Sequence, residues 1–194
     1  MTAATTYNHR DIMQTAWDRT RGAMRSGYAS DQLRAVFADC LRAAWRLAKA
    51  AARDAALTIE QVHMEIVDLQ NRTRLNLAGQ KRLSELQRLL SSKQEKADRD
   101  TKRSLIEGAG SQFVAVTFIK QDGSLRQMNI QPAALKTHVK GADASPAGQR
   151  AAATRKARHP HLMPVWDVEN AAIRSINLAT VQSIRTGGQT HNFA

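Results

Sequence analysis

Short runs with the alternating pattern of β-strands occur only after residue 110, and this division constrains the fold more than any other feature. Alternation places successive side chains on opposite faces of a strand, whereas apolar residues before residue 110 recur at helical spacing. The strand-like runs are residues 113–120, 125–130, 162–168, 172–178 and 181–186. We therefore predict an α+β protein with a helical N-terminal region and a C-terminal β domain.

The connections between these runs indicate how the strands pair and how the sheet closes. Asp122-Gly123 separates the first two runs and predicts a tight hairpin, because both residue types tolerate the positive φ of such turns. Only Ala179 and Thr180 separate the last two runs. Short strands expose edges that must be covered, and closing the sheet on itself covers them. We predict a five-stranded SH3-like β-barrel.

Several motifs in the same region carry a family resemblance. They are K-Q-D-G-S-L-R-Q-M at residues 120–128, H-V-K-G at 138–141, W-D at 166–167 and R-S-I-N-L at 174–178, followed by Val181 and Ile184. This set resembles a family of small phage and mobile-element domains with an Sm-like, SH3-type β-barrel fold, related to the WYL domain. The resemblance implies a barrel over residues 113–186 and brings no catalytic residue with it.

The helical region divides into a helix pair and a helical hairpin. We predict helices over residues 9–27, with Asp11 as its cap, and from about residue 30 to 56. Residues 12–17 and 37–45 resemble a two-helix module that recurs at the start of phage and plasmid proteins. Residues 58–70 and 80–106 follow as the hairpin. The predicted domains are therefore 1–57, 58–107 and 108–194.

One apolar stripe in the hairpin offers a surface for self-association. Ile59, Val62, Ile66 and Leu69 follow the 3-4-3 spacing of a coiled-coil seam. We consider a homodimer through this seam as one reading of the hairpin. The hairpin could instead be a spacer, or a docking surface for another protein. In the latter case, substitutions at Ile66 or Leu86 would weaken binding of that protein.

The charge of the chain favours a polyanionic partner. Lysine and arginine number 29 against 17 acidic residues, a net charge of +12. The excess includes a long loop, residues 142–160, that has no acidic residue after Asp143. We predict that eight cations in and around this loop bind nucleic acid or another partner: Arg126, Lys136, Lys140, Arg150, Arg155, Lys156, Arg158 and Arg174.

Signatures of catalysis and of metal binding are not found in the sequence. There is no nucleophile elbow, nucleotide-binding loop or zinc-ligand pattern, although His159 and His161 lie close together. We expect a protein that is not an enzyme, has no cofactor or metal, and is cytoplasmic. A single cysteine, Cys40, and the lack of a signal peptide or a membrane-spanning run support that location.

Three functions remain open at this point. The first is an accessory protein of a phage or mobile element that binds nucleic acid or a nucleoprotein complex through its basic β domain. The second is a protein-binding inhibitor of a host defence complex, similar in role to anti-CRISPR proteins. The third is a structural protein that dimerises through the hairpin seam.

Overall fold

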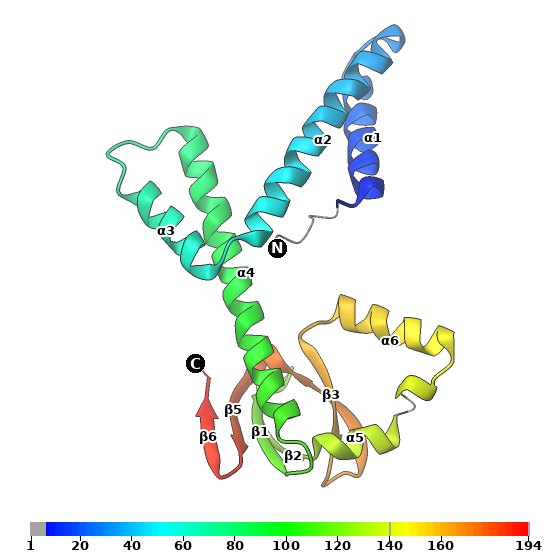
Figure 1. Ribbon diagram of the computed structural model, residues 1–194, viewed down its shortest axis with the longest axis vertical. Coiled ribbons are helices and arrows are strands. Elements are labelled where there is room, and N and C mark those ends of the chain that lie inside the picture. Colours follow the sequence, from blue (N-terminus) through cyan, green and yellow to red (C-terminus); the bar gives the residue numbers. More distant parts are fainter. Residues whose placement is uncertain (1–6, 140, 194) are drawn as a thin grey trace, which may run out of the picture. The chain divides into compact units, whose positions relative to one another are not determined.

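The computed structural model describes residues 7–139 and 141–193. It divides into two compact units, residues 1–90 and 91–194, which are treated separately below (Figure 1). The first unit is helical, and the second combines a β-sheet with helices. An α+β protein with a helical N-terminal part was predicted, and the structure confirms it.

A helix pair opens the first unit. Helix α1 covers His9–Arg25 and α2 covers Leu33–Ala56, after a 3₁₀ turn at Ser30–Gln32. The cap of α1 is Asn8 rather than the predicted Asp11, since the Asn8 side chain accepts hydrogen bonds from the first backbone N–H groups. Ile12, Ala16 and Ala44 form the core between the two helices.

The second half of the first unit is a helical hairpin. Helix α3 covers Ile59–Gln70 and α4 begins at Leu77 and runs to Gly108, so α4 continues into the second unit. Thr58 and Gln61 form a capping box at the start of α3. Val62, Ile66 and Leu69 of α3 are buried in one cluster with Leu86 of α4.

This cluster corrects the reading of the hairpin as a dimerisation seam. Three of the four seam residues are buried within the chain, and Ile59 is half-buried. An apolar stripe at 3-4-3 spacing packs equally well on a helix of the same chain, because the geometry of the contact is the same. Ile66 and Leu86 are core residues for the same reason, and the structure does not support a homodimer through them.

A charged cluster holds three helices of the first unit together. The guanidinium of Arg82 on α4 donates to both carboxylate oxygens of Asp54 on α2, at 2.8 and 3.0 Å. It also donates to Glu65 on α3, at 3.1 and 3.2 Å. The hydrogen bonds from Arg82 hold the pKa of Asp54 below its ordinary value, and those to Asp54 raise the pKa of Arg82.

The second unit is built on one antiparallel sheet of six strands. They are β1 Val114–Ile119, β2 Leu125–Ile130, β3 Leu162–Asp167, β4 Ala172–Asn177, β5 Val181–Thr186 and β6 Gln189–Asn192. Their order in the sheet is β4-β3-β2-β1-β5-β6. Ile106 from the end of α4 joins the core of this sheet, together with Val116, Ile130 and Ile184.

The sheet departs from the predicted five-stranded barrel in two ways. It has a sixth strand, β6, which pairs with β5 after the turn at Gly187 and Gly188. It is also open, because β4 and β6 are its two edges, so closure into an SH3-like barrel is not confirmed. The hairpin predicted at Asp122-Gly123 is present between β1 and β2, and Gly123 has a φ of 81°. Hydrogen bonds from Ser124 lower the pKa of Asp122 to about 2.

Two helices connect β2 to β3, and the second of them occupies most of the loop that was predicted at residues 142–160. Helix α5 covers Pro132–His138 and α6 covers Pro146–Arg158. Ser145 caps α6, Pro146 occupies its first turn and alanines fill its centre, all of which favour a helix. Among the described residues, no helix is long and apolar enough to cross a membrane.

Candidate anion-binding surface

The structure separates the eight predicted binding cations by their surroundings. Arg150, Arg155, Lys156 and Arg158 lie on α6, and Lys136 lies in the last turn of α5. Arg126 and Arg174 lie on β2 and β4. Lys140 falls outside the described residues. The candidate surface therefore consists of α5 and α6, and the two strand arginines belong to a different site.

Helix α6 exposes its whole length. Every residue from Pro146 to Arg158 is exposed, and none of its four cations forms an ion pair within the part of the chain that is described. Along the chain, α6 is preceded by α5 and leads into β3 (Figure 1). Three of the cations lie in the last turn, where the helix dipole favours positive charge. The result is a concentrated and unneutralised positive charge.

An open pocket of about 690 Å³ lies beside α6 within the second unit. Ala152, Arg155, Lys156 and His159 line it from α6, and their i, i+3, i+4, i+7 spacing puts them on one helical face. Lys136 lines it from α5. Arg150 and Arg158 do not line the pocket, so α6 carries cations both inside and outside it.

Two basic groups at this pocket were missed by the sequence reasoning. Arg103, near the end of α4, lines the pocket and donates a hydrogen bond of 2.8 Å to the backbone oxygen of Pro160. His159, the C-cap of α6, lines it as well. No local pattern in the sequence marks Arg103, because its place at the pocket follows from Ile106, one turn later, packing into the sheet.

The two strand arginines converge on a buried carboxylate. Asp167, at the end of β3, is fully buried and accepts a hydrogen bond of 3.2 Å from the Arg126 guanidinium. Arg174 Nε lies 3.4 Å from the same oxygen, and the backbone and side chain of Asn170 also donate to Asp167. Asp167 pairs with both guanidinium groups and offsets one of their two positive charges, so Arg126 and Arg174 have a structural role that the sequence prediction did not foresee.

A pair of stacked rings lies next to Lys136. The imidazole of His138 and the indole of Trp166 are almost parallel, with ring centres 3.6 Å apart. His138 is exposed and Trp166 is half-buried. The contact fixes the end of α5 against β3 and thereby holds Lys136 at the edge of the pocket.

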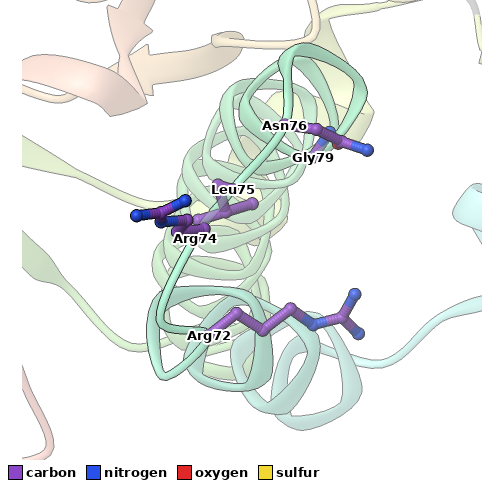
Figure 2. A pocket seen from close by; sticks show the side chains of 5 residues that line it. All are labelled: Arg72, Arg74, Leu75, Asn76 and Gly79. Carbon is purple, nitrogen blue, oxygen red and sulfur yellow. The ribbon is translucent and has the colours of Figure 1, made fainter.

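A second, smaller pocket in the first unit lacks the features of an anion site. It has a volume of about 390 Å³ and lies at the turn between α3 and α4 (Figure 2). Arg72 and Arg74 both line it, but Figure 2 shows their guanidinium groups pointing away from each other. Arg72 is paired with Asp68 at 2.7 Å, and Asn76 already accepts from the Gly79 backbone at the start of α4.

No arrangement of metal ligands is present in the part of the chain that the structure describes, where no three His, Cys, Asp or Glu residues cluster. His159 and His161 meet edge to face with ring centres 5.9 Å apart. Comparison of the chain with protein-family models, with curated proteins and with solved structures gives no match. The resemblance to phage β-barrel domains therefore stays a prediction.

Proposed function

We propose that the protein binds nucleic acid through the cations of α5 and α6, which neutralise phosphates of the backbone. The observation that carries this proposal is α6 itself, a helix with four cations, no acidic residue and no buried residue. Isolated helices of this length are marginal in water. Because α6 buries no residue, packing against the rest of the chain adds little to its stability. A polyanion along the helix supplies the missing stabilisation by removing the repulsion between its cations.

The surroundings of α6 support a phosphate partner over a structural role for its charge. Lys136 and Arg103 add positive charge to the lining of the pocket from α5 and α4, and among the described residues Glu107 is the only carboxylate that lines it. The chain as a whole carries +12, which attracts a polyanion from a distance. Phosphate contacts of this kind give affinity that does not depend on base sequence.

The salt dependence of binding tests this proposal. Fluorescence anisotropy with a labelled oligonucleotide, measured over a salt series, gives the slope of log K against log salt concentration. Each phosphate contact contributes about 0.7 to this slope for single strands and about 0.9 for duplex DNA. We expect the double variant Arg155→Gln/Lys156→Gln to reduce the slope by about 1.4 on single strands.

A matched double variant in the first unit serves as the control. Arg21 and Arg42 are exposed helical arginines that pair with Asp18 and Asp39. Changing both to glutamine removes the same formal charge and is expected to leave the slope unchanged. Equal losses from the two double variants would show that net charge alone governs binding, and absence of binding at low salt would overturn the proposal.

A further inference from the structure

The pocket beside α6 combines an apolar interior with a cationic rim. Its interior is lined by Leu135, Met163, Val165 and Ile173, from α5 and the β3–β4 hairpin. Ile173 is 46% exposed and Leu135 is half-buried, so part of this apolar lining is open to water, whereas Met163 and Val165 are buried. A ligand that covers it gains the free energy of removing apolar area from water. Simple phosphate binding by α6 leaves this feature unexplained.

In the described part of the chain, four cations from three helices line the pocket. Arg155 and Lys156 lie on α6, while Lys136 and Arg103 come from α5 and α4. A ligand that combines anionic groups with an apolar body is therefore complementary to it. Hydrogen-bonding groups are also present within the lining, at Ser175, Glu107 and His159. These groups can form hydrogen bonds with a ligand that has apolar faces and polar edges. A hydrocarbon chain has no polar edge and would leave them without partners.

We propose that this pocket receives an unpaired nucleotide, with the base against the apolar lining and its phosphates at the cationic rim. The inference rests on the proposed nucleic-acid binding and adds a preference for single strands. Bases within a duplex are stacked and paired, so their faces cannot reach the pocket without being extruded. The phosphates of a duplex remain accessible to Arg150 and Arg158 on the outer part of α6.

A substitution that fills the pocket without changing charge tests this inference. Ala152 lines the pocket from α6, and the next residue, Ala153, does not. Both are exposed alanines in the same helix, so Ala152→Trp and Ala153→Trp have similar intrinsic effects on folding. Circular dichroism on both variants of the full chain confirms that helix content is retained.

The affinities of a labelled single-stranded oligonucleotide and of the matching duplex are measured at one salt concentration. We expect the single strand to bind about tenfold more tightly, the effect of placing one base in a pocket. Ala152→Trp removes this preference and leaves duplex binding unchanged, whereas Ala153→Trp changes neither. Displacement of the single strand by adenosine monophosphate would show that a free nucleotide also fits, and displacement by longer strands alone would show that several phosphates are needed.

The contrary outcomes are distinct from failure of the proposed function. Equal binding of single strand and duplex, unaffected by Ala152→Trp, would overturn the nucleotide pocket while leaving phosphate binding by α6 intact. Displacement by poly-L-glutamate at the same charge concentration as the oligonucleotide would also overturn it, since the site would then recognise charge or an acidic protein segment. Absence of binding to both nucleic acids would contradict the proposed function itself.

Discussion

Asp167 is the residue at which three separate sequence motifs meet. Arg126 from the first hairpin motif and Arg174 from the R-S-I-N-L motif both contact its carboxylate, and Asp167 itself belongs to the W-D motif. The carboxylate is buried, while the side chains of Arg126 and Arg174 are 31% and 46% exposed. The motifs therefore describe a structural centre that ties β2, β3 and β4 together.

The importance of this centre can be measured through folding stability. Asp167→Ala removes a buried acceptor that takes charged and neutral hydrogen bonds, and we expect the free energy of unfolding to fall by about 2 kcal/mol. Urea unfolding followed by far-UV circular dichroism provides the value. Glu169→Ala is the control, because Glu169 is an exposed carboxylate that accepts one hydrogen bond, from Asn129. Equal stability of the two variants would contradict a structural role for Asp167.

The sequence prediction was incomplete at this scale because charge alone does not show which cations are neutralised. Arg126, Arg174 and Lys136 carry the same formal charge in the sequence, yet the first two contact Asp167 and the third lines the pocket. Asp167 is 41 residues from Arg126 along the chain, so only the pairing of strands brings them together.

Among the elements, helices α2, α3 and α4 are linked by the side chain of one arginine, Arg82. Arg82 is partly buried and donates four hydrogen bonds to Asp54 and Glu65. Arg82→Ala leaves both carboxylates without this partner, and we expect it to reduce the free energy of unfolding by about 2 kcal/mol at pH 7. The exposed pair of Arg72 and Asp68 gives the comparison, and Arg72→Ala is expected to cost about 0.5 kcal/mol or less.

The cluster of Arg82, Asp54 and Glu65 should make the free energy of unfolding depend on pH. Because the folded-state pKa of Asp54 is below its ordinary value of 3.8, its contribution is present above that value and is lost as the pH falls through the folded pKa. The stability difference between wild type and Arg82→Ala should therefore shrink when urea unfolding is repeated below pH 3.8. A difference that stays constant to the lowest pH at which the protein folds would contradict this assignment.

Helix α6 shows why one element was predicted as a loop. Its apolar residues are alanines without a dominant stripe, and a helix that buries nothing needs no amphipathic pattern. The helical signals it does carry are local ones, namely the Ser145 cap, Pro146 and the alanine run. By contrast, α3 and β1 bury apolar faces, and their periodicity predicted them correctly.

At the scale of the whole molecule, the order of α1 to α4 and of β1 to β5 was predictable because it follows from periodicity along the chain, whereas α6 and β6 were not predicted. The pocket was not, since its lining combines α4, α5, α6, β3 and β4. Closure of the sheet was also beyond sequence reasoning, because five or six short strands satisfy the same pattern in an open or a closed sheet. The positive charge suggested a polyanionic partner, and the structure shows that the cations of α6 are among those that form no ion pair in the described part of the chain.

Hydrogen exchange of the full chain, with and without a single-stranded oligonucleotide, tests the central claim most directly because it needs no substitution. In the free protein, α6 should exchange faster than α3, because α3 buries Val62, Ile66 and Leu69 whereas α6 buries no residue. Binding should slow exchange across residues 132–138 and 146–158 and leave α1 and α2 unchanged. Protection confined to α1 and α2, or no change in α6 when the oligonucleotide is bound, would contradict the account.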